Sequence, residues 1–304
     1  MVIVVDGQER INNSIMMDLT NKTELLEYLK ANGLWAKHGL GQNFLVDSEA
    51  LEKIVGATDL ASDDLVVEVG PGLGTLTEEL TKKAGKVLAV EIDDKLAQLL
   101  NGYMAQLLKD NNITIEQYNN FELINSDILK INVPELVGKR KYKVIANIPY
   151  YITSKIIKLF LTTVNKPESI VLLVQKEVAE RICAKKGDMS ILALSVQVYG
   201  TPEIIGIVPR SSFFPSPAVD SAILRISNIG YTLPDVPENV LFRNIKFGFA
   251  SKRKTLVNNF SSAYKLDKSA VIDILKSNNI GPNARAEELD LNDWASLSKI
   301  FLKY

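Results

Sequence analysis

The chain has 304 residues, of which 46% are apolar and 23% charged, as expected for a globular protein of about two domains. It contains one cysteine, Cys183, and one histidine, His38, which exclude an intrachain disulfide and argue strongly against a hydrolase triad or histidine-rich metal site. The net charge of −1 argues neither for nor against nucleic-acid binding, because that binding depends on a local basic patch.

The sequence gives no sign of export or membrane insertion. No apolar run approaches the ~18–20 residues that cross a bilayer. The opening MVIVVDGQER lacks the basic start and long apolar stretch of a signal peptide. We therefore expect a cytoplasmic protein with no membrane association and no metal. Cys183 lies in a segment with amphipathic helical spacing, which favours a packed thiol over a nucleophile.

Residues 1–34 form an N-terminal extension in which one helix, within residues 21–32, is predicted from its capping residues. From residue 65 to about 227, strand-like and helix-like segments alternate, which implies crossover connections and a mostly parallel sheet. The expected strands are residues 65–70, 86–92, 121–125, 143–146, 169–175, 203–208 and 219–226. Helices are expected at 75–83 and from the cap Asp93 to about residue 108. Near-continuous apolar strands predict an α/β, Rossmann-like sheet covered by helices on both faces.

The character of the chain changes near residue 228. Residues 229–240 contain two prolines and a glycine, and helical spacing dominates from there to the end. We expect one domain over residues 35–228 and a small all-helical domain over residues 229–304.

A glycine-rich loop follows the first strand of the sheet and opens a helix. It reads EVGPGLG over residues 68–74, and Gly70 and Gly72 would let a ligand approach the backbone closely. Glu91, at the end of the next strand, could accept hydrogen bonds from both hydroxyls of a ribose. The spacing departs from the dinucleotide pattern G-x-G-x-x-G and resembles the first motif of S-adenosylmethionine-dependent methyltransferases. Asp127 ends the third strand and could accept from an adenine amine, or could be only a helix cap.

The fourth strand ends in Asn147-Ile148-Pro149-Tyr150, at the edge of the sheet where ligands bind in open α/β folds. An aromatic amine is a poor nucleophile, because its lone pair is delocalised into the ring. The side-chain carbonyl of Asn147 and the backbone carbonyl of Ile148 could accept hydrogen bonds from the amine and so free that lone pair for attack. Pro149 would stiffen the loop, and Tyr150 offers a ring for stacking a base. The plainer alternative is a strand followed by a proline turn.

Six motifs in order resemble the ribosomal RNA adenine dimethyltransferases. They are GLGQNFL (39–45), EVGPGLGTLT (68–77), ANIPYYITS (146–154), VPRSSFFPSP (208–217), FGFASKRKTLVNNF (247–260) and NARAEELDL (283–291). The resemblance implies an S-adenosylmethionine-dependent enzyme that dimethylates two adjacent adenosines near the 3′ end of small-subunit rRNA during ribosome biogenesis. Its partner would be the immature small subunit, and a monomer is expected.

The resemblance also implies site residues. The cofactor contacts would be Asn43, Leu45, Gly70, Gly72, Glu91, Asp127 and Asn147. Phe213 would stack on a flipped-out adenine from the face opposite Tyr150, although two neighbouring aromatics are also typical of a core. Phosphate contacts are expected from Arg210, Lys252, Arg253 and Lys254. For the last three, a solvated surface is the alternative.

Two departures leave other functions open. Ile148 stands where this family more often has leucine, and isoleucine there is frequent in the large-subunit rRNA methyltransferases of macrolide resistance. Ala218 occupies a place where lysine is common. The alternatives are therefore a large-subunit enzyme of that type, or a nucleic-acid-binding assembly or transcription factor that has lost catalysis. The C-terminal motifs favour the small-subunit enzyme.

Overall fold

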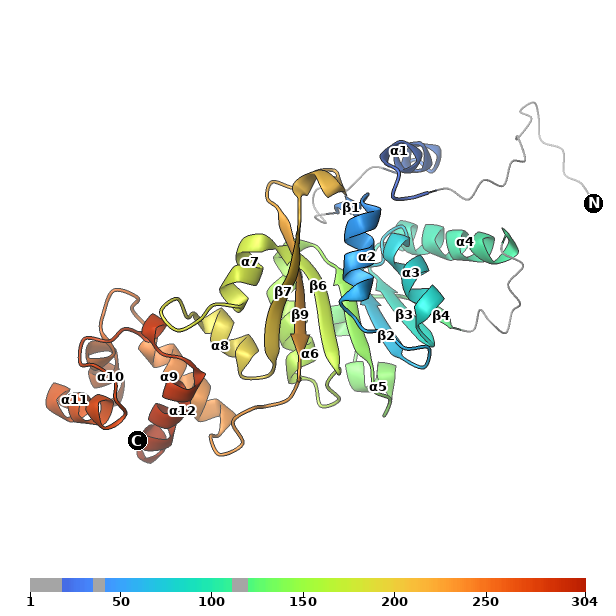
Figure 1. Cartoon of the computed structure of the whole chain (residues 1–304). Helices are drawn as coiled ribbons and strands as arrows, with labels where there is room; N and C mark the ends of the chain where they lie inside the picture. Colours follow the sequence, from blue (N-terminus) through green and yellow to red (C-terminus); the bar gives the residue numbers. More distant parts are fainter. Residues whose placement is uncertain (1–17, 35–41, 111–119) are drawn as a thin grey trace, which may run out of the picture.

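The computed structural model describes residues 18–34, 42–110 and 120–304, and its centre is a seven-stranded sheet (Figure 1). The strand order is β4-β3-β2-β5-β6-β9-β7. The pairs from β4 to β6 are parallel, whereas β9 runs antiparallel to both β6 and β7. The strands are β2 (Leu65–Val69), β3 (Lys86–Glu91), β4 (Phe121–Asn125), β5 (Lys143–Asn147), β6 (Ser169–Gln175), β7 (Thr201–Val208) and β9 (Ser221–Ser227).

Helices cover both faces of the sheet, as the apolar strands predicted. Val66 of β2 packs in the core beneath α2 (Ser48–Gly56) and α3 (Thr75–Lys83). Its neighbours Leu65 and Val67 pack in the core of the opposite face, because successive side chains of a strand point to opposite sides. The remaining helices of this part are α1 (Lys22–Ala31), α4 (Asp94–Asp110), α5 (Val133–Val137), α6 (Thr153–Thr162), α7 (Lys176–Ile182) and α8 (Ile191–Gln197).

Most predicted strand limits are confirmed to within a residue, and the largest differences are at the antiparallel end. β9 begins at Ser221, two residues later than expected. The reason is that Asp220 still belongs to the preceding loop, where its Oδ1 accepts a hydrogen bond of 3.0 Å from the backbone N–H of Arg210. In the described part of the chain, none of the helices has the length and apolar character needed to span a membrane.

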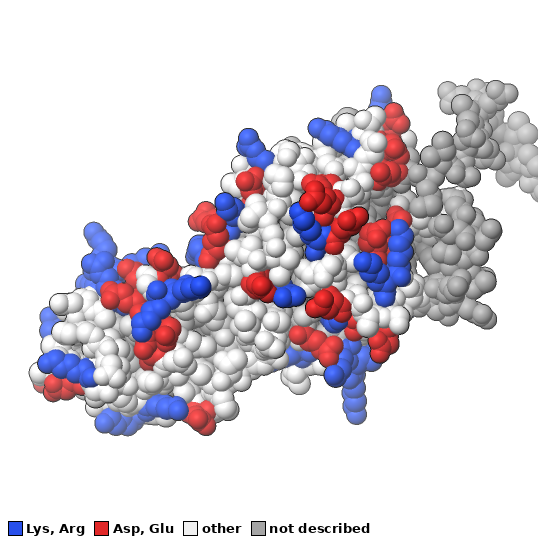
Figure 2. Space-filling model, viewed as in Figure 1, with Lys and Arg blue, Asp and Glu red and all other residues white. Residues whose placement is uncertain are grey.

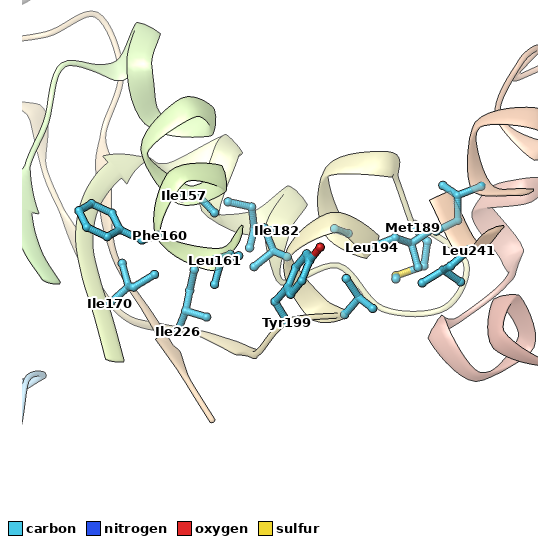
Figure 3. Packing of buried hydrophobic residues seen from close by; sticks show 14 of the residues in the cluster. Ile157, Phe160, Leu161, Ile170, Ile182, Met189, Leu194, Tyr199, Ile226 and Leu241 are labelled. Carbon is cyan, nitrogen blue, oxygen red and sulfur yellow. The ribbon is translucent and has the colours of Figure 1, made fainter. Parts of the chain in front are cut away.

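Four further helices form the C-terminal region at one end of the molecule, beside α7 and α8 (Figure 1). They are α9 (Glu238–Gly248), α10 (Leu256–Tyr264), α11 (Lys268–Ser277) and α12 (Leu291–Ile300). Their core surrounds the fully buried Trp294 and continues without a break into the sheet domain. Figure 3 shows Met189, Leu194 and Tyr199 leading toward Leu241 of α9.

A short two-stranded ribbon lies outside the main sheet. β1 (Phe44–Leu45) pairs antiparallel with β8 (Phe213–Phe214). The pairing is extended by a hydrogen bond from the Val46 N–H to the carbonyl of Ser212, and by one from the Ser212 hydroxyl to Asp47. The segment before α2 is therefore fastened to the loop that precedes β9.

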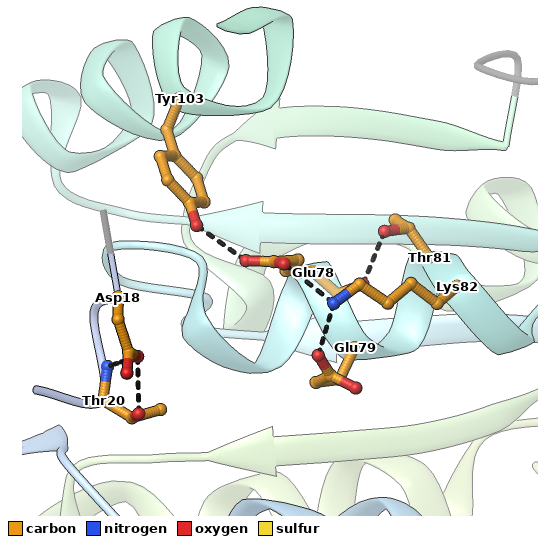
Figure 4. A network of polar contacts seen from close by, with 7 residues as sticks. All are labelled: Asp18, Thr20, Glu78, Glu79, Thr81, Lys82 and Tyr103. Atoms are coloured by element: carbon orange, nitrogen blue, oxygen red, sulfur yellow. Dashed lines mark hydrogen bonds and ion pairs between the residues drawn. The ribbon is translucent and has the colours of Figure 1, made fainter. Parts of the chain in front are cut away.

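One polar contact joins α3 to α4, and two ion pairs lie within α3 beside it (Figure 4). The hydroxyl of Tyr103 donates to Glu78 at 2.6 Å, and Lys82 forms ion pairs with Glu78 and Glu79 at 2.8 and 2.6 Å. Packing allows little freedom nearby, because a Cβ on Gly74 would lie 2.5 Å from Cδ1 of Leu100 in α4. The start of α3, just after the glycine-rich loop, is thus held in place from its flank.

Replacing Gly248 by alanine should destabilise the C-terminal region. A Cβ there would lie 2.2 Å from Cη2 of Trp294, which is fully buried and cannot move aside. Overpacking of this kind costs about 1–3 kcal/mol, measurable as a lower urea midpoint. Gly102→Ala in α4 is the control, because nothing lies within 4 Å of its Cβ position and the change should be neutral or stabilising. Equal midpoints for the two variants would contradict this packing.

Candidate active site

A cavity of about 280 Å³ lies at the carboxyl ends of β2, β3 and β5. Parallel pairing places these three strand ends at the same edge of the sheet, where open α/β folds bind ligands. Ten residues singled out from the sequence share its wall: Asn43, Leu45, Gly70, Gly72, Glu91, Asp127, Asn147, Ile148, Pro149 and Tyr150. Residues separated by more than a hundred positions are thus gathered around a single space.

The glycine-rich loop forms one side of the cavity. Gly70, Gly72 and Gly74 have φ values of 67°, 61° and 98°, a region that side-chain-bearing residues rarely adopt. A Cβ on Gly72 would also lie 3.6 Å from the Phe44 ring and would make the cavity narrower. The loop ends at the first turn of α3, whose backbone N–H groups favour negative or polar ligand groups.

Glu91 is buried at the end of β3, and its carboxylate is held by two backbone donors. Its Oε2 accepts from the N–H of Gly72 at 3.1 Å and its Oε1 from the N–H of Asp93 at 2.8 Å. Burial raises the pKa of Glu91, and these two hydrogen bonds oppose the rise. Each oxygen has a second lone pair with which it can accept from a ligand hydroxyl.

Asp127 is a helix cap, one of the two roles that its sequence position suggested, and its contact with an adenine amine stays a prediction. Its Oδ1 accepts from the N–H of Leu129 at 3.0 Å and so caps the short 3₁₀ helix η2 (Ile128–Lys130), while the residue lines the cavity. Ile92 and Leu129 were missed as site residues. Both are exposed apolar side chains on the cavity wall, and each follows an acidic strand-end residue closely in the sequence. That proximity is the signal that could have revealed them.

The amide of Asn147 is oriented by the chain segment before β1. Its Nδ2 donates to the backbone carbonyl of Asn43 at 3.3 Å. The side-chain carbonyl of Asn147 is consequently the atom left to accept a hydrogen bond, and no described residue donates to it. Pro149 has φ −56° and ψ 133°, which turns the chain from β5 into the 3₁₀ helix η3 (Tyr150–Ile152).

Tyr150 is anchored across the sheet. Its hydroxyl shares a hydrogen bond of 2.7 Å with the Oγ of Ser221, the fully buried first residue of β9. Burial raises the pKa of Tyr150, and the bond to Ser221 opposes the rise. The ring lines the cavity next to the strongly exposed ring of Tyr151. Ser221 was not singled out from the sequence, because only the tertiary fold brings it to Tyr150.

The other predicted site residues lie away from the cavity wall. Phe213 is only 3% exposed and packs in the core beneath α2, because its backbone pairs with Leu45 in the β1–β8 ribbon. Its stacking role stays a prediction. Arg210 is exposed at the start of the 3₁₀ helix η4 (Arg210–Ser212), just before β8. Residues 252–254, the basic cluster, are exposed between α9 and α10. Of the opening motif, residues 39–41 lie outside the described residues, as does His38.

The face of the molecule shown in Figure 2 carries, over its described residues, no large patch of a single charge. Basic and acidic side chains are interspersed over the face shown in Figure 2. Among the residues that the structure describes, no group of three or more histidine, cysteine, aspartate or glutamate side chains is placed to hold a metal ion.

Glu68 is the most unusual titratable group near the cavity. The side chain is 1% exposed, and neither carboxyl oxygen has a hydrogen-bond partner among the described residues. Burial raises its pKa from the ordinary 4.5 to about 8, and the like charge of Glu91 adds to the rise. The nearby Thr77 hydroxyl, also buried and without hydrogen-bonding geometry, opposes it only partly.

A mostly parallel sheet with a glycine-rich loop and acidic strand ends around one cavity is typical of a Rossmann-like methyltransferase, and solved methyltransferases share the fold. The family model described as ribosomal RNA adenine dimethylase matches residues 34–303. The chain therefore belongs to the ribosomal RNA adenine dimethylase family.

Individual relatives agree with this assignment. A ribosomal RNA small subunit methyltransferase A from Dehalococcoides mccartyi is 44% identical over 89% of this chain and 90% of its own length. The protein of the same name from Alkaliphilus metalliredigens is 40% identical over 86% and 90%. Among solved structures, a dimethyladenosine transferase from Plasmodium falciparum has a TM-score of 0.70 at 28% identity, covering 85% of this chain and 97% of its own. The 23S rRNA methyltransferase ErmE has a TM-score of 0.67 at 26% identity, with coverages of 84% and 98%.

Glu68→Gln should remove a pH-dependent loss of stability. Between its unfolded pKa of 4.5 and its folded pKa of about 8, the folded protein keeps a proton that the unfolded chain releases. Stability therefore falls as pH rises through this window, by up to about 1.4 kcal/mol per pH unit. Urea unfolding from pH 5 to pH 8 should show the variant gaining on the wild type as pH increases.

The control for this experiment is Glu122→Gln, which alters an exposed residue of β4 and removes its surface ion pair with Lys86, a pair that stays charged from pH 5 to pH 8. Its stability should follow the wild type at every pH. If Glu68→Gln and the wild type lose stability in parallel between pH 5 and pH 8, Glu68 does not carry the proton.

Proposed function

We propose that this protein transfers methyl groups from S-adenosylmethionine to the exocyclic amines of two adjacent adenosines near the 3′ end of small-subunit rRNA. The observation that carries the proposal is the cavity in which the Asn147–Tyr150 loop meets the glycine-rich loop, Glu91 and Asp127. The substrate follows from the small-subunit name shared by relatives at 37–44% identity.

The cavity suits a nucleoside cofactor in shape and in polar groups. Its volume of about 280 Å³ is close to the lower limit of ligand sites, roughly 300 Å³. Gly70 and Gly72 leave room for a ligand beside the backbone. Glu91 would accept hydrogen bonds from the ribose hydroxyls of the cofactor, and Asp127 one from its adenine amine. Ile92 and Leu129 would pack against the adenine ring of the cofactor. Asn43 and Leu45 would close the side formed by the β1 segment.

When bound, the cofactor supplies an electrophilic methyl group on a sulfonium sulfur. The chain's contribution is to orient the acceptor. The side-chain carbonyl of Asn147 and the backbone carbonyl of Ile148 would accept hydrogen bonds from the two amine N–H groups. These bonds would favour the pyramidal nitrogen, whose lone pair can attack the methyl group. No strong base is needed, because alkylation makes the nitrogen cationic and its N–H protons acidic, so one of them can leave to water. The rate enhancement would come from alignment and preorganised dipoles.

The target base would be held by aromatic stacking. Tyr150 is fixed by Ser221 and presents its ring to the cavity, and such stacking is worth roughly 1–3 kcal/mol per base. A second stacking face from Phe213 would require that side chain to leave the core, where it is 3% exposed. Loop 209–220 would have to rearrange as RNA binds.

Two alternatives are less well supported. ErmE, which acts on 23S rRNA by its name, is 26% identical, whereas the small-subunit relatives reach 44%. A factor that has lost catalysis has no need for Glu91, Asp127 and Asn147 around one cavity. Residues 35–228 would be the catalytic domain and residues 229–304 the RNA-binding domain of a cytoplasmic monomer that acts on immature small subunits.

Asn147→Ala should abolish most methyl transfer. Loss of one preorganised polar group at a reacting centre typically lowers the rate by about 10²–10³-fold. The measurement is transfer of labelled methyl from S-adenosylmethionine to unmodified small subunits, with the modified adenosines mapped by mass spectrometry. Asn132→Ala, at an exposed asparagine before α5, is the matched control and should keep wild-type activity. A parallel assay with large subunits tests the substrate, and methylation of 23S rRNA alone would overturn the assignment.

Removing the 252–254 basic cluster should weaken RNA binding in a salt-dependent way. Each lost phosphate contact lowers the slope of log K against log salt by about 0.7–0.9, so a triple alanine variant should lose up to about 2–3. The comparison is a triple alanine variant of residues 139–141, a second exposed basic run. If only the 139–141 variant changes the slope, the RNA binds to residues 139–141 and not to the basic cluster.

A further inference from the structure

The buried carboxyl of Glu68 lies on β2, two residues before the loop that opens the cavity. Its neighbours across the sheet are Ala89 of β3 and Ile145 of β5. Ile145 and Val66 pack beneath α2 and α3, so the Glu68 side chain points to the same face, toward Thr77 of α3. Glu68 does not line the cavity and can influence a ligand only through the electric field.

The surroundings of Glu68 offer little compensation for a negative charge. From β3, Glu91 acts on it with the same sign, and from α3 the polar contribution is the Thr77 hydroxyl. Within the described residues, no cationic side chain acts on the carboxyl, and neither oxygen has a partner in hydrogen-bonding geometry. The Thr77 hydroxyl is the one neighbour that opposes the rise of the Glu68 pKa. A buried, unpaired carboxylate is strongly unfavourable, so the group needs a proton or an external cation.

The proposed function, on which this inference rests, provides such a cation. S-adenosylmethionine carries a positive sulfonium, and the cavity that would hold it lies at the carboxyl end of the strand that carries Glu68. Charges in a poorly solvated site interact over several ångströms far more strongly than in water. The product, S-adenosylhomocysteine, is identical except that its sulfur is an uncharged thioether.

We propose that Glu68 is neutral in the cofactor-free protein, releases its proton to solvent when a sulfonium cofactor binds, and takes up a proton once the sulfur has become a thioether. The ionised carboxylate then stabilises the donor and not the spent product. Glu68 would therefore favour exchange of product for fresh cofactor. This property would matter for an enzyme that must transfer several methyl groups.

Calorimetry can count the protons. Titration of each cofactor in two buffers of different ionisation enthalpy gives the protons released on binding, for the wild type and for Glu68→Gln. Near pH 7 the wild type should release up to one more proton with S-adenosylmethionine than with S-adenosylhomocysteine, beyond any difference seen in the variant. Protons from the cofactor's own amine appear equally in both proteins. Between pH 6 and pH 8 the affinity ratio of donor to product should rise by up to about tenfold per pH unit in the wild type only.

Infrared difference spectroscopy of the wild type provides a second measurement that needs no variant. Donor binding should remove the carbonyl stretch of a protonated carboxyl group, and product binding should leave it. An equal proton excess in Glu68→Gln, or no excess and no infrared change in the wild type, would overturn the inference. If the donor binds without proton release and small subunits are still methylated, this inference alone fails. If the donor does not bind at all, the proposed function fails with it.

Discussion

The parallel pairing of β2 with β3 and β5 is the constraint on which the site depends. Pairing of Val69 with Val90 and of Glu68 with Ile145 brings Gly70, Glu91 and Asn147 to one edge of the sheet. Strands that are apolar on both faces need helices on both sides, which the crossover connections supply. The same connections leave the strand ends uncovered. Burial of the strands and exposure of the reacting groups thus come from one arrangement.

Much of this arrangement was readable from the sequence, because its signals are local. Alternating apolar strands and helices gave the fold class. Strand ends in glycine, carboxylate and amide gave five residues of the cavity wall: Gly70, Gly72, Glu91, Asp127 and Asn147. Phe213 was harder, because its burial depends on pairing with Leu45, far away in the chain and over only two residues. The contact between Ser221 and Tyr150, and the isolation of Glu68, also depend on tertiary packing that no local pattern encodes.

Hydrogen bonds and strand pairing connect the residues proposed to bind the cofactor with those proposed to bind the target base. Asn43 lines the cavity and orients the Asn147 amide, while its neighbours in β1 pair with β8 in the loop proposed to receive the base. Tyr150 is tied to the start of β9, at the other end of that loop. The loop is therefore anchored on both sides to residues of the cavity wall.

The β1–β8 ribbon has a consequence for protein engineering. Replacing loop 209–220 with that of a relative, in order to redirect the enzyme to another nucleotide, would replace β8 but leave its partner β1 unchanged. Residues 43–47 would then face a foreign partner at Phe44, Leu45 and Asp47. Specificity in this scaffold should therefore be exchangeable only as a two-segment cassette, with the early strand moved together with the distant loop.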